Sequence, residues 1–245
     1  MVVCLAVIRN WLRSRSGLLY SFLFPVILLL ILGSIYGNPG SPSKAIGQST
    51  AIYFLPGLTA AFIMANGVIG LTNVGSELKR NGTLRRLAAT PLTKLEWLLG
   101  NVLSQTVLAF VLAALMLVLG AVLYNVSVLI NAYFLVMLFL GVLLFYGVGM
   151  SLAGLVKDPG AASGLSNFIA FPMMLLSGTF WPVSSMPSYL QTVARVLPLT
   201  YFADGLRNSM VSADFSGALT DLAVVAVFAM VLVVLGARFT QWNES

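Results

Sequence analysis

Long stretches of apolar residues, separated by short polar or charged segments, dominate the chain. Five stretches carry no charge and have the length, about 20 residues, that a helix needs to cross a bilayer core of roughly 30 Å. A sixth is interrupted only by Asp221, near its start. The pattern predicts one domain, 1–245, an all-α integral membrane protein with six transmembrane helices: 18–36, 52–73, 102–124, 129–156, 161–180 and 218–237.

Basic residues fall mainly on one side of the membrane if six such helices alternate in direction. The loops on the other side contain only Lys44, Arg195 and Arg207. By the positive-inside rule, both termini are predicted to be cytoplasmic in a multi-pass protein of the cell membrane. The first apolar run is longer than the core of a secretory signal, and five more follow, which favours a retained helix.

The N-terminal residues 2–12 have Val3, Val7 and Trp11 at helical spacing, beside Arg9 and Arg13. This pattern is typical of a short amphipathic helix at the cytoplasmic interface. A frayed basic terminus is the alternative.

The segment between predicted helices 2 and 3 has the pattern of a short basic helix. Its residues are Gly82, Thr83, Leu84, Arg85, Arg86, Leu87 and Pro91. The threonine can cap the helix, the two leucines share one face beside the arginines, and the proline ends it. Thr93 and Glu96 then have the spacing of a capping box for the next helix. The segment could dock into a cytosolic partner, or its charges could only set the topology.

The segment between predicted helices 5 and 6, residues 181–217, is too apolar for an open external loop. Pro182, Pro187 and Pro198 divide it. One short helix is predicted from Pro187, and a second is predicted after a cap at Thr200. Asp204 and Arg207, three residues apart, can pair on the second helix. Two short re-entrant helices that dip into the outer leaflet are the predicted structure.

Composition removes several classes of function. Of the 245 residues, 59% are hydrophobic and 8% are charged, and histidine is absent. Histidine-based catalysis and histidine-ligated metals are therefore excluded, and the lone Cys4 forms no thiolate cluster. The net charge of +6 is explained by basic cytoplasmic loops, so no nucleic-acid partner is expected.

The spans also lack the groups that drive transport within a single chain. The first five contain no ionisable carboxylate for ion coupling, and no Gly-Lys dipeptide of a phosphate-binding loop occurs anywhere. The chain is therefore not expected to be an enzyme or to hold a cofactor or metal. A transport protein of this kind is either passive or driven by a partner.

Two segments resemble ABC-2 type transporter permeases, most closely the daunorubicin-type drug and lipid exporters. The first is the run from Asn81 to Leu92, followed by Leu99-Gly100, and the second is Ser177-Gly178-Thr179-Phe180-Trp181-Pro182 with Leu197-Pro198-Leu199-Thr200. The resemblance implies a second permease chain, commonly in a homodimer, and two cytosolic ABC ATPase subunits that bind ATP and Mg. It also implies that Gly82 to Pro91 is the coupling helix.

Helices 1, 2 and 5 of the two copies would then surround a pathway through the lipid membrane. Phe168, Phe171, Met173 and Met174 on helix 5 suit the lining of a path for amphiphilic drugs or lipids, although such side chains also face lipid or pack. The predicted function is the membrane-spanning subunit of an ATP-driven exporter. The alternatives are a non-transporting accessory or immunity subunit, a polysaccharide-exporting permease, and a passive channel or ion-coupled carrier.

Overall fold

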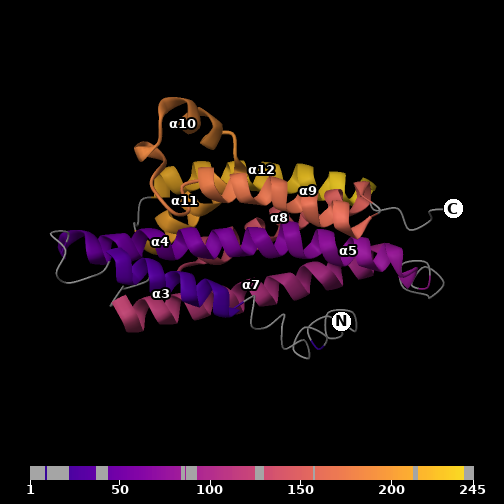
Figure 1. Cartoon of the computed structure of the whole chain (residues 1–245), viewed down its shortest axis with the longest axis horizontal. Helices are drawn as coiled ribbons and strands as arrows, with labels where there is room; N and C mark the ends of the chain where they lie inside the picture. Colours follow the sequence, from indigo (N-terminus) through magenta and orange to yellow (C-terminus); the bar gives the residue numbers. More distant parts are fainter. Residues whose placement is uncertain are drawn as a thin grey trace.

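A computed structural model describes residues 9, 22–36, 44–83, 86, 93–124, 130–156, 158–211 and 215–239. Every regular element within these ranges is helical (Figure 1). The elements are α3 (Phe24–Tyr36), α4 (Lys44–Ala65), η2 (Asn66–Gly70), α5 (Leu71–Arg80), α7 (Lys94–Tyr124), α8 (Ala132–Leu155), α9 (Pro159–Leu176), η3 (Val183–Ser185), α10 (Ser188–Ala194), α11 (Pro198–Val211) and α12 (Phe215–Phe239). The predicted all-α class is confirmed for the described residues.

Five described helices are long and apolar enough to cross a membrane: Tyr53–Arg80, Glu96–Tyr124, Ala132–Leu155, Pro159–Leu176 and Leu219–Arg238. They correspond to predicted helices 2 to 6. The predicted first span, 18–36, is represented by the 13 residues of α3, and residues 18–21 lie outside the described part. The six-span count therefore stays a prediction.

The second span is longer than the sequence pattern predicted. The helix begins at Lys44 and runs through α4, η2 and α5 to Arg80, as one path along the molecule (Figure 1). The prediction of 52–73 marked only its uncharged part. Helices commonly extend past the bilayer core, since polar residues at their ends reach water. The middle of this helix, Asn66–Gly70, has π-helical hydrogen bonding, which no sequence pattern had indicated.

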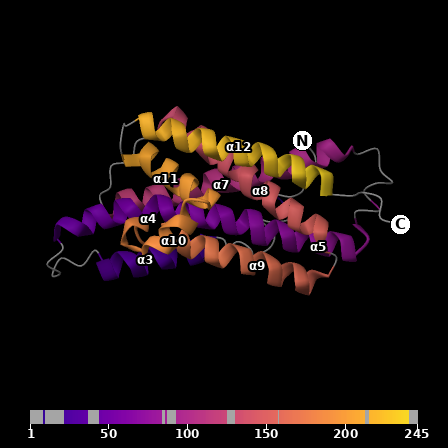
Figure 2. The ribbon, with the colours of Figure 1, turned by 90° about the horizontal axis from the view of Figure 1, so that it is seen from above.

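Helix α8 lies between the other helices, with α9 and α12 at opposite edges of the bundle (Figure 2). Two glycines on α8 allow neighbouring helical segments to approach it closely. A β-carbon added to Gly147 would lie 2.7 Å from the carbonyl carbon of Leu232 on α12. A β-carbon added to Gly149 would likewise collide with the carbonyl oxygen of Gly67 in η2. These glycines of the fourth span therefore allow close helix packing.

The predicted pair of short helices after the fifth span is present, with a different start for the second. Pro198 is the first residue of α11, and Thr200 lies inside its first turn. The predicted cap at Thr200 is wrong, because its hydroxyl donates instead to the carbonyl oxygen of Ala194 in α10, at 2.7 Å. Helix α11 is buried against α4, α8 and α12, whereas α10 projects from the side of the bundle (Figure 1).

Candidate functional site

Two ends of the bundle carry the polar features of interest. We call them the α10 end and the α5 end, after the helices labelled there in Figure 1. The last residues of α3, α7 and α9 and the first residues of α4, α8 and α10 lie at the α10 end. The last residues of α5 and α8 and the first residues of α7 and α9 lie at the α5 end.

At the α10 end, Tyr53, Gly178, Asp204 and Arg207 form a polar group that we call the Arg207 cluster. The Tyr53 hydroxyl donates to the Gly178 carbonyl oxygen at 2.6 Å, and Arg207 donates to the same oxygen at 3.2 Å. The guanidinium carbon of Arg207 lies 3.7 Å from the centre of the Tyr53 ring, a cation–π contact. The cluster therefore joins α4, the turn after α9, and α11.

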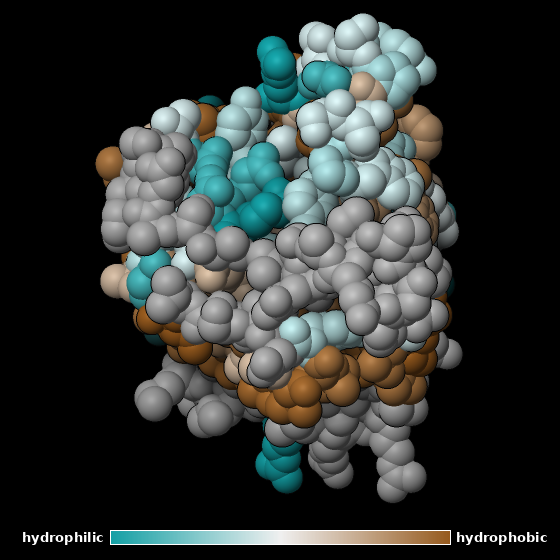
Figure 3. All heavy atoms as spheres, turned by 90° about the vertical axis from the view of Figure 1, so that its left-hand side faces the viewer, coloured by the Kyte–Doolittle hydropathy of each residue, from teal (hydrophilic) through white to brown (hydrophobic). Residues whose placement is uncertain are grey.

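Arg207 also pairs with Asp204 one turn earlier on α11, as the sequence predicted. The Arg207 side chain is 16% exposed and that of Asp204 is 46% exposed, so the pair lies at the edge of the bundle. Partial burial raises the pKa of the Asp204 carboxyl above its usual value, while the neighbouring guanidinium acts in the opposite direction. Figure 3 looks onto this end and shows hydrophilic side chains gathered on its described part.

The turn after α9 can approach α4 closely because of two glycines. Gly178 has a φ of +71°, a backbone conformation that side chains other than glycine rarely adopt. Gly57 on α4 leaves room for the backbone of Thr179, whose carbonyl oxygen would meet an added β-carbon. The Thr179 hydroxyl in turn donates to the Met174 carbonyl oxygen at 2.6 Å. The turn is thus fixed from both sides.

The prolines predicted to divide this region mark its boundaries. Pro182 precedes η3, Pro187 directly precedes α10, and Pro198 begins α11. Pro182 and Pro187 are exposed, and neither lies in the Arg207 cluster.

At the α5 end, the predicted coupling segment lies mostly outside the described residues. Gly82, Thr83 and Arg86 are described, and the amide of Arg86 donates to the carbonyl oxygen of Gly82 at 3.2 Å. Gly82 has a φ of +64°, so the chain turns there directly after α5. Leu84, Arg85, Leu87 and Pro91 lie outside the described residues.

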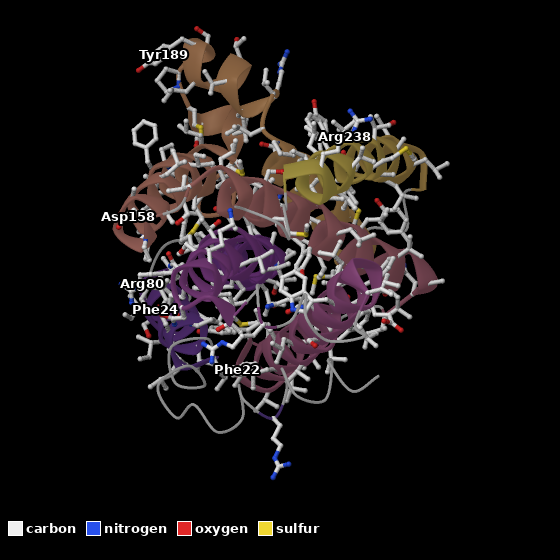
Figure 4. The ribbon with its side chains drawn as sticks, turned by 90° about the vertical axis from the view of Figure 1, so that its right-hand side faces the viewer. Phe22, Phe24, Arg80, Asp158, Tyr189 and Arg238 are labelled. Carbon is white, nitrogen blue, oxygen red and sulfur yellow. The ribbon has the colours of Figure 1, made fainter. Side chains whose placement is uncertain are left out.

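Side chains on both sides of this segment stabilise helix ends: those of Thr93 and Glu96 at the start of α7, and that of Lys79 at the end of α8. The predicted capping box is confirmed: the Thr93 amide donates to Glu96 Oε2 at 2.9 Å, and the Glu96 amide donates to Thr93 Oγ1 at 3.2 Å. Lys79 Nζ donates to the Gly154 carbonyl oxygen at 2.9 Å, in the last turn of α8. Figure 4 looks onto this end and labels Arg80, the last residue of α5, and Arg238, in the last turn of α12.

The four predicted pathway residues on α9 do not share one environment. Phe168 and Phe171 are 76% and 57% exposed on the surface of the chain, whereas Met173 is 8% exposed and belongs to the core. Met174 is partly buried against that core. Gly164, on the same helix, has nothing within 4 Å of an added β-carbon. The outer face of α9 is therefore apolar and open within this chain.

Sequence reasoning found the pair of Asp204 and Arg207 but not their partners Tyr53 and Gly178. The sequence signal that could have pointed to Gly178 was the Ser-Gly-Thr motif, because its glycine permits a turn with positive φ. Within the described ranges, no three His, Cys, Asp or Glu side chains gather in a way that could hold a metal ion. The hydrogen bonds and the ion pair of the Arg207 cluster hold α4, the turn after α9 and α11 together.

Comparison with known proteins gives the class. The family model of the ABC-2 type transporter matches residues 1–211, and the chain therefore belongs to the ABC-2 type transporter family. It is a multi-pass membrane protein.

Three relatives illustrate the range of the family. The chain is 29% identical over 183 residues to ABC transporter G family member 20 of Dictyostelium discoideum, covering 72% of this chain and 23% of that protein. It is 24% identical over 150 residues to the linearmycin resistance permease protein LnrN of Bacillus subtilis strain 168, covering 61% and 39%. It is 24% identical over 194 residues to the daunorubicin resistance ABC transporter permease protein DrrB1 of Streptomyces coeruleorubidus, covering 77% and 66%. The chain thus spans less than two thirds of the length of each of these relatives.

Proposed function

We propose that this chain is the membrane-spanning subunit of an ATP-driven exporter of amphiphilic drugs, lipids or similar molecules. Two separate cytosolic ATPase subunits would bind ATP and Mg and supply the energy. The observation that carries the proposal is the family match over residues 1–211. Two of the relatives are named for resistance to linearmycin and to daunorubicin, which supports export of an amphiphile.

The proposed contact with the ATPases is the segment from Gly82 to Pro91. The helical path from Lys44 to Arg80 is about 55 Å long and α7 is about 46 Å long, so both exceed a hydrocarbon core of roughly 30 Å. If both helices extend past the core at this end, the segment between them would lie away from the bilayer. Basic Arg80 and Arg238 lie at the same end, which supports a cytoplasmic assignment for it and for both termini.

The same helical path would transmit movement between the two ends. Its α4 part enters the Arg207 cluster through Tyr53, and its α5 part ends two residues before Gly82. A displacement of α5 by the ATPase would strain the hydrogen bonds of Tyr53 and Arg207 to Gly178. Release of these bonds would free α10 and α11, the re-entrant pair of short helices, to open the external end of the pathway.

A second copy of the chain would complete the pathway, in a homodimer, with the outer face of α9 toward it. Phe168 and Phe171 are exposed on that face, and Gly164 lets another backbone approach closely. Met173 and Met174, which face the core of this chain, would line the pathway only after a rearrangement of α9. Substrates of mixed polarity suit an apolar surface of this kind.

The coupling contact is tested by charge reversal in the complex of this chain with its ATPase, reconstituted in lipid nanodiscs. Arg86→Glu is expected to lower ATP turnover, and the Arg85→Glu, Arg86→Glu double variant is expected to detach the ATPase. Arg238→Glu makes the same charge change at the same end and should leave turnover near that of the wild type. Equal effects of Arg86→Glu and Arg238→Glu would contradict the assigned contact.

Export itself is tested with sealed vesicles that contain the complex. A fluorescent amphiphile such as daunorubicin should move only when ATP is supplied on the ATPase side. Movement along a gradient without ATP would favour a passive channel or carrier. No stimulation of ATP turnover by any amphiphile or lipid would favour a non-transporting subunit.

A further inference from the structure

A small cavity lies between Phe22, which precedes α3, the junction of α4 with η2, α7 and α8. The centre of a water molecule can occupy about 30 Å³ of this cavity. Most of the lining is apolar and includes Phe22, which Figure 4 labels. Three polar residues also line it, each from a different helical segment: Asn66, Gln105 and Tyr146. The cavity lies near the middle of the second span, far from the Arg207 cluster.

Tyr146 is the unusual member of this lining. Its side chain is 2% exposed, and its hydroxyl has no hydrogen-bond partner within the described part of the chain. A buried hydroxyl without a partner is unfavourable, and most such groups in folded proteins are paired with protein or with ordered water. The hydroxyls of Tyr53 and Tyr124 both donate directly to backbone carbonyl oxygens. Tyr146 lines the cavity, which is the place from which a partner for this hydroxyl would come.

The neighbouring amides can supply the remaining hydrogen bonds. Asn66 uses its amide nitrogen for the Phe62 carbonyl oxygen, at 2.9 Å, which leaves its side-chain oxygen able to accept. Gln105 on α7 adds both a donor and an acceptor at the same cavity. A water molecule needs two to four polar partners and about 10–15 Å³ of such volume. The site meets both conditions.

We propose that this cavity is a water-binding site that holds one or two molecules. They would bridge the hydroxyl of Tyr146 to the side chains of Asn66 and Gln105. An apolar ligand does not fit this chemistry because it would leave the hydroxyl unpaired.

The position of this water site explains where the second span changes its hydrogen bonding. Asn66 and Gly67 line the cavity and are also the first two residues of the π-helical segment. Water that inserts beside a helix is a recognised cause of bending, and π-helical segments mark places where helices deform. The hydrated cavity gives the span a polar bending point between the Arg207 cluster and the α5 end.

Hydroxyl-radical footprinting by X-ray radiolysis tests the site in the unmodified full chain in lipid nanodiscs. Radicals form from bound water in place, so a side chain that contacts such water is oxidised even when it is buried. Phe145 is the matched control, because it precedes Tyr146 on α8, is fully buried, and packs against Phe202 with ring centres 5.7 Å apart. Tyr146 should be oxidised several times faster than Phe145. Equal slow rates at the two residues would overturn the proposal.

A second test uses the sign of a stability change. Tyr146→Phe removes only the hydroxyl. If water bridges it, the variant should unfold at a temperature lower by about 2–4 °C, the shift that the loss of a typical hydrogen bond gives in a chain of this size. In a dry cavity the same change removes an unpaired polar group. A melting temperature equal to or higher than that of the wild type would therefore overturn the proposal.

Discussion

Gly57→Ala isolates the close contact between α4 and the turn after α9. The new β-carbon would press on the Thr179 carbonyl oxygen and lie 3.1 Å from Thr179 Cα. The turn cannot move away freely, because the Gly178 carbonyl oxygen is held by Tyr53 and Arg207. Overpacking of this kind costs about 1–3 kcal/mol. Weakening of the two hydrogen bonds adds about 1 kcal/mol, and the better helix propensity of alanine returns about 1 kcal/mol.

The net effect is a loss of about 2 kcal/mol of unfolding free energy, which lowers the melting temperature by on the order of 4–8 °C. Thermal unfolding in mild detergent, followed by tryptophan fluorescence, measures it. Gly70→Ala is the matched control on the same helical path, because Gly70 has helical φ and ψ of −60° and −50° and nothing within 4 Å of an added β-carbon. The control should unfold at or slightly above the wild-type temperature. The reasoning fails if Gly57→Ala is as stable as Gly70→Ala.

Three further substitutions have expected outcomes. Arg207→Met leaves Asp204 without its cation and should lower the unfolding free energy by about 2 kcal/mol, a value between those for exposed and for buried ion pairs. Asp204→Asn should lower it by less. Chemical denaturation in detergent compares the two variants. Thr93→Ala breaks the capping box and should cost about 1 kcal/mol, with faster amide exchange at the start of α7 as the specific readout. Lys79→Met removes the charged donor to the Gly154 carbonyl oxygen and should lower the melting temperature by on the order of 3–6 °C, whereas Lys79→Arg should retain part of the stability.

Local patterns in the sequence predicted local structure well. The uncharged runs located five long helices to within a few residues at most ends, because length and hydropathy decide which segments can span a bilayer. The capping box of Thr93 with Glu96 and the pair of Asp204 with Arg207 each join residues three positions apart. Such spacing fixes the contact once a helix is present.

Contacts between distant segments could not be predicted in the same way. Tyr53 and Gly178 are 125 positions apart, and the residues near Tyr53 do not indicate which distant residue accepts its hydrogen bond. The π-helical segment Asn66–Gly70 contains no proline, and its change of hydrogen bonding coincides with the cavity at Asn66 and Gly67. Thr200 has the residue type of a cap, but Pro198 already begins the helix, so the hydroxyl is free to bond α10. Tertiary packing decides each of these features.

The measurement that tests the central claim most directly is identification of what the chain binds in its native membrane. The chain carries a tag at its C-terminus, is cross-linked in the membrane, purified in mild detergent and analysed by mass spectrometry. The account predicts a stoichiometric subunit with an ATP-binding phosphate loop, cross-linked through the segment from Gly82 to Pro91. Purification of the intact chain in repeated experiments without any ATP-binding subunit would contradict the account.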